Sequence, residues 1–99
     1  MNWRDWFSRP SGDVERHVQF YTRSNCPLCE EAMVILRKHA PRWGLVIEVI
    51  DIEGDAVLEE RFGMEIPVVF IDGRRRFFGR VDEVLLRRIL ERPRQGGAE

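Results

Sequence analysis

The most constraining feature of the sequence is a strand–helix–strand pattern in its first half. Residues 14–22 (VERHVQFYT) are rich in β-branched and aromatic residues and predict a strand. From Leu28 onward apolar residues recur at helical spacing, and we expect Pro41 and Gly44 to end this helix. Residues 45–52 (LVIEVIDI) are almost continuously aliphatic, which predicts a strand buried on both faces of a sheet. Together these segments predict a βαβ unit with two parallel strands.

The second half of the sequence predicts a short helix and then a hairpin. The short helix covers residues 54–62, and we expect its side chains Val57, Leu58 and Phe62 to face inward, with Gly63 closing it. Next, the apolar run 66–71 (IPVVFI) ends in Asp72-Gly73, a dipeptide typical of two-residue hairpin turns. Residues 75–78 would form the returning antiparallel strand.

A last helix is predicted to begin at Asp82, which suits an N-cap, and to end before Pro93. The predicted order is therefore β-α-β-α-β-β-α, an α/β fold whose four-stranded mixed sheet has helices on both faces. The apolar face of the last helix is expected to consist of Val81, Val84, Leu85, Leu86 and Ile89.

Length and charge limit the chain to one soluble domain. Ninety-nine residues allow a single core, and a net charge of -1 gives no general attraction to nucleic acid or membranes. No apolar run could span a bilayer, and charged residues interrupt the first dozen residues, so we expect a cytoplasmic protein. We predict an N-terminal extension (1–13), a domain (14–92) and a disordered tail (93–99). In the extension, the spacing of Trp3, Trp6 and Phe7 predicts an amphipathic turn packed on the domain, or an exposed partner or dimer contact.

Cys26 and Cys29 are the only cysteines, and they stand at the start of the first predicted helix. Between them, Pro27 suits the first helical position, where a missing N–H removes no hydrogen bond. The partial positive charge and free N–H groups of a helix N-terminus favour a thiolate over a thiol. In a βαβ context, C-x-x-C is typical of a redox-active dithiol. We expect Cys26 to be exposed, with a pKa below the usual value of about 8.5, and Cys29 to lie buried behind it.

Two other interpretations of the cysteines are weaker. A structural disulfide would constrain little of the unfolded chain, because the cysteines are so close in sequence. A zinc site would need two more ligands, and His17 and His39 do not form a second closely spaced pair. We therefore expect no bound metal or cofactor.

Three motifs together resemble the glutaredoxins, within the thioredoxin-fold superfamily. They are residues 21–29 (YTRSNCPLC), 66–73 (IPVVFIDG) and 78–82 (FGRVD), and the resemblance runs from about Val14 to Leu90. It implies a thioredoxin fold and thiol–disulfide oxidoreductase activity, with disulfide-containing proteins as substrates. Glutathione is the implied co-substrate, and we expect the protein to be a monomer.

The resemblance also implies roles for individual residues. Cys26 matches the attacking cysteine and Cys29 the resolving one. Pro67 matches a proline that is cis in the superfamily, and beside it the backbone of Ile66 would pair with an extended substrate. Arg23 stands where a cation contacts the thiolate and the glycine carboxylate of glutathione, and residues 79–82 stand where the γ-glutamyl end binds. The implied substrate-binding residues are Arg23, Pro27, Leu28, Ile66, Pro67, Gly79, Arg80, Val81 and Asp82.

The sequence departs from the commonest glutaredoxin pattern at three positions. Leu28 replaces a tyrosine, Glu65 stands where many members carry threonine, and Gly79 is a single glycine where a pair is common. Glu65 would repel a carboxylate if it pointed into the substrate groove. Three alternatives stay open: a thioredoxin-like electron carrier that does not use glutathione, an iron–sulfur cluster protein, and an interaction module with an incidental C-x-x-C.

Several charged residues have plain structural interpretations. Residues 74–76 (RRR) predict a solvated hairpin edge that discourages aggregation, with a partner-docking patch as the alternative. His17 and His39 are expected to be ordinary surface or half-buried side chains. Asp51 is expected to be a loop acid, although it could assist proton transfer to Cys29.

Overall fold

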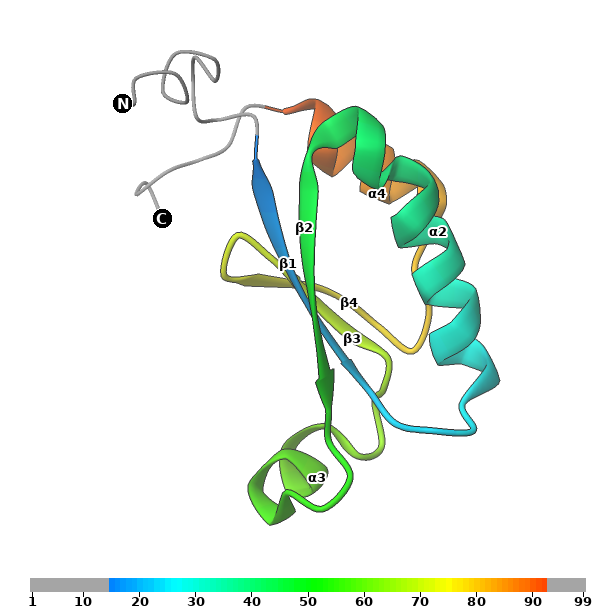
Figure 1. Cartoon of the computed structure of the whole chain (residues 1–99), viewed down its shortest axis with the longest axis vertical. Helices are drawn as coiled ribbons and strands as arrows, with labels where there is room; N and C mark the ends of the chain where they lie inside the picture. The colour runs from blue at the N-terminus through cyan, green and yellow to red at the C-terminus, as the bar shows by residue number, and fades with distance from the viewer. Residues whose placement is uncertain (1–14, 93–99) are drawn as a thin grey trace.

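The computed structural model describes residues 15–92, and their elements follow the predicted order β-α-β-α-β-β-α (Figure 1). The predicted N-terminal extension with its three aromatic residues, and the tail from Pro93 onward, lie outside the described residues. In residues 15–92, no helix is long and apolar enough to cross a membrane. The elements are β1 (Arg16–Thr22), α2 (Pro27–Trp43), β2 (Leu45–Asp51), α3 (Ala56–Phe62), β3 (Val68–Ile71), β4 (Arg74–Phe78) and α4 (Glu83–Glu91).

The four strands form one mixed sheet in the order β2-β1-β3-β4. β1 pairs in parallel with β2 and antiparallel with β3, and β3 pairs antiparallel with β4. In this register Val18 lies opposite Ile47 on one side and Ile71 on the other. The arrangement confirms the predicted thioredoxin fold, with β1 as a central strand that leads directly to the cysteines.

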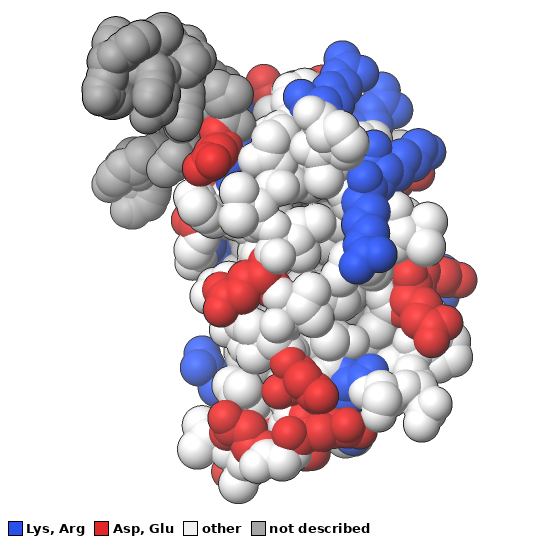
Figure 2. Space-filling view, in the orientation of Figure 1, with Lys and Arg blue, Asp and Glu red and all other residues white. Residues whose placement is uncertain are grey.

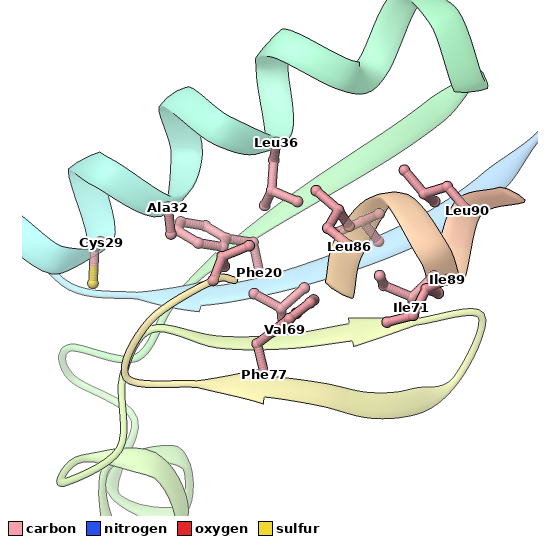
Figure 3. Packing of buried hydrophobic residues seen from close by; sticks show 12 residues of the cluster. Phe20, Cys29, Ala32, Leu36, Val69, Ile71, Phe77, Leu86, Ile89 and Leu90 are labelled. Atoms are coloured by element: carbon pink, nitrogen blue, oxygen red, sulfur yellow. The ribbon is translucent and has the colours of Figure 1, made fainter. Parts of the chain in front are cut away.

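One face of the sheet carries the main hydrophobic core, covered by α2 and α4 (Figure 3). In Figure 1 α4 lies partly behind α2, and residues of both helices share one buried cluster. Phe20 on β1 packs in one buried cluster with Ala32 and Leu36 of α2 and Leu86 of α4. Because side chains three and four positions apart lie on one side of a helix, Cys29, Ala32 and Leu36 all face this core.

The opposite face of the sheet is covered by α3 near the end of β1. The ring of Phe62 lies with its centroid 4.5 Å from that of Tyr21 and 6.2 Å from that of Phe70. Tyr21 and Phe70 alternate with core residues along their strands and so point away from α2 and α4. Helices therefore lie on both faces of the sheet, as predicted.

The β3–β4 hairpin turns at Asp72 and Gly73, which have φ values of 51° and 85°. Positive φ at both positions fits a two-residue turn and explains why an Asp-Gly pair stands there. The register then shifts, because Phe70 pairs with Arg75 whereas Val69 pairs with Phe77. Arg76 is the extra residue of this bulge. The bulge allows Phe77 to enter the core while the neighbouring arginine remains exposed.

Arg16 joins the start of the sheet to the hairpin and to the end of α4. This buried guanidinium donates to Asp72 at 2.6 Å and, at 3.4 Å each, to the carbonyl oxygens of Leu90 and Arg92. Asp72 also accepts a hydrogen bond from the backbone N–H of His17. A cation at a helix C-terminus is favourable, so Arg16 ties three elements together at the end of the molecule far from the cysteines.

The first predicted helix and the strand after it differ from expectation. Pro41 does not end the helix: α2 continues to Trp43 and stops at Gly44, whose φ is 65°. The proline lies near the exposed C-terminal end, where losing one hydrogen bond costs little. β2 is not buried on both faces, because it is an edge strand with Val46 and Val49 exposed.

The later elements also differ in detail from the predictions. In α3 Phe62 is buried but Val57 is exposed, and Gly63 caps the helix with a helical φ of -56° rather than a left-handed one. The strand predicted from residue 66 begins at Val68. In α4, Val84 and Leu85 are exposed, contrary to expectation. The buried face of α4 is Leu86, Ile89 and Leu90, the i, i+3, i+4 set that points at α2 and the sheet.

His39 is a buried residue of α2 rather than a surface one. Its Nε2 lies 2.7 Å from a carboxylate oxygen of Glu83, at the first turn of α4, and Lys38 lies 2.9 Å from the same oxygen. The hydrogen bonds from Lys38 and then His39 hold the pKa of the Glu83 carboxyl below its ordinary value of 4.5. This polar contact links α2 to α4 beside the shared core.

We expect Leu36→Ala to lower the free energy of unfolding by about 2–5 kcal/mol, since it leaves a cavity between α2, α4 and the sheet. Urea denaturation followed by circular dichroism measures the change. The matched variant Val34→Ala, on the exposed side of the same helix, should shift it by no more than about 0.5 kcal/mol. Equal effects of the two variants would contradict the assigned core.

Glu83→Gln should destabilise the protein in a way that depends on pH. Because the folded-state pKa lies below the unfolded value, the carboxylate stabilises the fold above pH 4.5, and this contribution is lost as pH falls through the folded-state pKa. Wild type should therefore be more stable than the variant at pH 6.5, and the difference should vanish in strong acid. The matched variant Glu91→Gln replaces an exposed carboxylate of the same helix that has no ion pair among residues 15–92, and it should change the free energy of unfolding by no more than about 0.5 kcal/mol at pH 6.5.

Candidate active site

The cysteine pair lies where β1 ends and α2 begins. Cys26 is the N-cap of α2, with extended backbone, and Pro27 takes the first helical position. The backbone N–H of Cys29 donates to the Sγ of Cys26 at 3.2 Å, and the N–H of Glu30 donates to the Cys26 carbonyl at 3.0 Å. A sulfur in this position receives a helix N–H in the way that a serine or aspartate cap does. The predicted start of the helix is therefore confirmed.

The loop before Cys26 is fixed to the end of β2. The Thr22 carbonyl accepts a hydrogen bond from the Ile52 N–H at 2.9 Å, and the Ser24 hydroxyl donates to the carboxylate of Glu53. Asn25 has a φ of 55°, the left-handed conformation that turns the chain sharply into the helix. These contacts hold the cysteine on a short, constrained connection.

The two cysteines form a disulfide, with their Cα atoms 5.2 Å apart. Cys29 is only 3% exposed and belongs to the hydrophobic core, whereas Cys26 is partly exposed at the surface. A thiol or thiolate in solution can therefore approach Cys26 far more easily than Cys29. The structure thus separates an accessible sulfur from a protected one, as the sequence predicts.

A pocket of about 220 Å³ opens beside the disulfide. Its walls come from the end of β1, the connecting loop, the first two turns of α2 and the exposed side of β2. Sequence analysis did not assign most of these residues, and only the alternation along the strands could have indicated Val49. The pocket is lined by Phe20, Thr22, Arg23, Ser24, Asn25, Cys26, Cys29, Glu30, Met33 and Val49.

Arg23 lines this pocket together with both cysteines, but its guanidinium also forms an ion pair with a residue of α3. Its Nη2 lies 3.1 Å from a carboxylate oxygen of Glu59. Its Nε is buried and has no hydrogen-bond partner among the described residues. The sequence singled out Arg23 as a cation near the thiolate, but it did not reveal Glu59, a partner supplied by another helix.

The Ile66–Pro67 peptide bond is cis, as the resemblance implies. Pro67 is buried, and Ile66 is partly buried against the same hydrophobic cluster that Cys26 contacts. The N–H of Gly79 lies 2.8 Å from the Pro67 carbonyl and 2.9 Å from the Glu65 carbonyl. Gly79, which follows β4, thus holds the loop around Pro67 in place.

Glu65 does not act as a lone charge beside this loop. Its carboxylate forms an ion pair with Arg75 of β4. The guanidinium of Arg75 also lies 5.0 Å from the centre of the Phe78 ring. The guanidinium of Arg75 therefore partly neutralises the negative charge of Glu65.

The segment from Gly79 to Asp82 leads into α4. Gly79 has a φ of 79°, and Val81 is buried in the same core cluster as Cys29. The carboxylate of Asp82 accepts hydrogen bonds from the N–H groups of Val84 and Leu85 at 3.0 and 3.2 Å. The predicted N-cap is confirmed. Those two donors are therefore not free for a ligand, and binding of the γ-glutamyl group here stays a prediction.

Acidic residues are concentrated at the α3 end of the molecule. Residues 51–65 contain six acids and one arginine. On the face shown in Figure 2, acidic side chains gather at this end and basic ones gather at the other. Asp51 does not line the pocket beside Cys29, and its carboxylate accepts a hydrogen bond from the Glu53 N–H at 2.9 Å within its own turn. Within residues 15–92, no group of three or more His, Cys, Asp or Glu side chains could hold a metal ion.

Comparison with known proteins agrees with this geometry. Residues 17–91 match the family model described as Glutaredoxin-like domain (DUF836). The chain belongs to this glutaredoxin-like family. Uncharacterized proteins from Mycobacterium bovis and Mycobacterium tuberculosis are 32% identical over 75 residues, covering 71% of this chain and 77% of theirs.

Solved structures show the same fold. Protein Ne2328 from Nitrosomonas europaea superposes with a TM-score of 0.68 at 26% identity, covering 78% of this chain and 93% of that one. Protein XcR50 from X. campestris gives a TM-score of 0.64 at 31% identity, covering 75% and 95%. A thioredoxin from Halobacterium salinarum, at 18% identity and a TM-score of 0.58, covers 86% and 80% and shows the fold alone. This glutaredoxin-like domain with its C-x-x-C pair supports a thiol redox function.

After reduction, we expect the two thiols to differ strongly in reactivity. With Cys29→Ser, Cys26 should react with iodoacetamide faster than free cysteine at pH 6.5, because it is accessible and its thiolate accepts helix N–H groups. With Cys26→Ser, Cys29 should react much more slowly in the native protein. Mass spectrometry of timed samples measures both rates. Similar rates in the two variants would contradict the assignment of an accessible and a protected sulfur.

Proposed function

We propose that this protein is a dithiol thiol–disulfide oxidoreductase. In its reduced form the Cys26 thiolate attacks one sulfur of a substrate disulfide, which forms a mixed disulfide and releases the other substrate sulfur as a thiol. Cys29 then loses its proton and attacks Cys26, which releases the second substrate thiol and leaves the Cys26–Cys29 disulfide. The substrate gains two electrons and two protons. The protein supplies both electrons and the Cys29 proton, and the other proton comes from solvent, because Cys26 reacts as a thiolate.

The observation that carries this proposal is the unequal placement of the two sulfurs. Cys26 is accessible at the N-cap of α2, whereas Cys29 is almost fully buried one turn further along. An intermolecular disulfide is therefore favoured at Cys26, and the protected Cys29 is left to resolve it. The helix N–H that contacts Cys26 stabilises negative charge on the attacking and leaving sulfur.

Substrate would bind across the surface formed by the loop that carries Cys26, the loop that carries Pro67 and the start of α4. Leu28, which is 37% exposed, offers an apolar contact beside Cys26. The backbone of Ile66 would pair with an extended substrate segment. Contact of the substrate with Leu28, Ile66, Pro27 and Pro67 is part of the proposal. So are a monomeric state and a cytoplasmic location, where reductants keep such pairs active.

We further propose that glutathione reduces the Cys26–Cys29 disulfide. One glutathione thiolate would attack Cys26 and release Cys29. A second would attack the sulfur of the bound glutathione, which forms glutathione disulfide and releases Cys26 as a thiolate. Arg23 lines the pocket beside Cys26 and would receive a glutathione carboxylate, and residues 79–82 would receive the other.

The charge distribution around the site favours a second candidate reductant, a protein in place of glutathione. Glutathione carries net negative charge, while the α3 end of the molecule is acidic, and Glu59 already pairs with Arg23. In addition, Asp82 already accepts from two N–H groups at the start of α4. A thioredoxin-type reductase or another protein partner would not depend on these anion contacts.

An assay with a small disulfide, glutathione, glutathione reductase and NADPH tests the proposal. Wild type should catalyse NADPH oxidation, and Cys26→Ser should show only the uncatalysed rate because no attacking thiolate remains. Cys29→Ser should accumulate a mixed disulfide with a protein substrate, which mass spectrometry detects. If wild type is inactive with glutathione but active with a thioredoxin-type reductase, the glutathione step is wrong and the exchange chemistry stands. Full activity of Cys26→Ser would overturn the proposed function.

A further inference from the structure

A second, larger pocket lies at the end of the molecule away from the cysteines. It has a volume of about 400 Å³ and lies between β4 and the C-terminal half of α4. Arg16, which lines it, stands at the start of β1, whereas Cys26 follows the end of that strand. Five of the seven lining residues are arginines and none is acidic, the full set being Arg16, Arg74, Arg76, Leu85, Arg88, Ile89 and Arg92.

The hairpin bulge helps to create this concentration of charge. Arg74 precedes the register shift, and Arg76 is the residue without a cross-strand partner. The shift places Phe77 in the core and leaves Arg76 at the rim beside α4, where both arginines line one wall. Arg88 and Arg92, four positions apart at the end of α4, line the opposite wall.

The guanidinium groups on these two walls have no counterion among the described residues. Among residues 15–92, no hydrogen bond or ion pair involves the side chains of Arg74, Arg76, Arg88 or Arg92. Asp72, an acid in the adjacent turn, is committed to Arg16 and to the N–H of His17. Like charges held together without a counterion repel one another, and a bound anion would relieve that repulsion.

Arg16 also removes an obstacle to anion binding. The C-terminus of α4 carries partial negative charge, which would repel an anion nearby. Arg16 donates to the carbonyl oxygens of Leu90 and Arg92 and so compensates this charge at the base of the pocket. Leu85 and Ile89 contribute apolar surface to the lining.

We propose that this pocket binds a small anion that carries two or more phosphate groups. Guanidinium groups donate paired N–H bonds to phosphate, and four of them on two opposing walls can surround a tetrahedral group better than a planar carboxylate. The pocket is compact and concave, and no aromatic side chain lines it for stacking bases. The whole chain carries a net charge of only -1, so it has no general attraction to nucleic acid. A small polyphosphate therefore fits better than a polynucleotide.

Isothermal titration of the oxidised full-length protein with pyrophosphate tests this site. We expect saturable binding of one pyrophosphate per chain that weakens as salt rises. Arg76→Gln and Arg88→Gln should each weaken binding about tenfold, the loss expected for one hydrogen bond to a charged group. Arg87→Gln, the matched control on α4 outside the pocket, should change the affinity less than twofold. Circular dichroism would verify that all variants are folded.

Other probes distinguish the alternatives. Inorganic phosphate and citrate should both bind more weakly than pyrophosphate, and Cys26→Ser should bind pyrophosphate as wild type does. Absence of saturable binding at millimolar pyrophosphate would overturn the proposal, as would equal effects of Arg87→Gln and Arg88→Gln. Equal affinity for citrate or for inorganic phosphate would also overturn it. Tighter binding of a nucleic acid duplex or an acidic peptide through Arg76 and Arg88 would assign the site to a macromolecule instead.

Discussion

The packing of α2 against β1 is the interaction on which the rest of the molecule depends. Phe20, Ala32 and Leu36 share one buried cluster, and the small side chain of Ala32 lets the helix approach the central strand closely. This contact fixes where the helix begins, and therefore where Cys26 emerges at the surface. It also places Cys29 on the core side of the first turn. Redox asymmetry between two chemically identical thiols thus follows from helix packing.

The sequence was sufficient to predict the features that depend on local geometry. Asp72-Gly73 requires positive φ at two neighbouring residues, and Asp82 supplies an N-cap carboxylate, so both signals are visible in a few letters. The same holds for the cysteine pair at the start of α2, because its helix position follows from Pro27 and the periodicity after it. The placement of helices on both faces of the sheet was also predictable, since it follows from the succession of elements.

The errors concern which side of an element is covered, and this depends on distant parts of the chain. The aliphatic run of β2 was compatible with a central strand, and only the order β2-β1-β3-β4 makes it an edge with Val49 exposed. In α4, local spacing does not decide between Leu85 and Leu86 as the inward side chain, and it is Leu86 that packs in the core shared with α2 and the sheet. The partners of Arg23 and His39 lie on other helices, so no local motif could have indicated Glu59 or Glu83.

The two ends of the molecule differ in charge, and the fold explains how one small domain can hold acidic residues at one end and arginines at the other. On the face shown in Figure 2, acidic side chains gather at the α3 end. Arg74 and Arg76 of β4 and Arg88 of α4 line the basic pocket at the other end. Arg16 pairs with Asp72 and with the last carbonyls of α4, so these groups are not left to balance the other arginines that line the basic pocket. Among residues 15–92, the core cluster shared by the two ends consists of hydrophobic side chains, and the buried polar residues Arg16 and His39 are not part of it. Separate chemistry at the two ends is therefore compatible with a shared core.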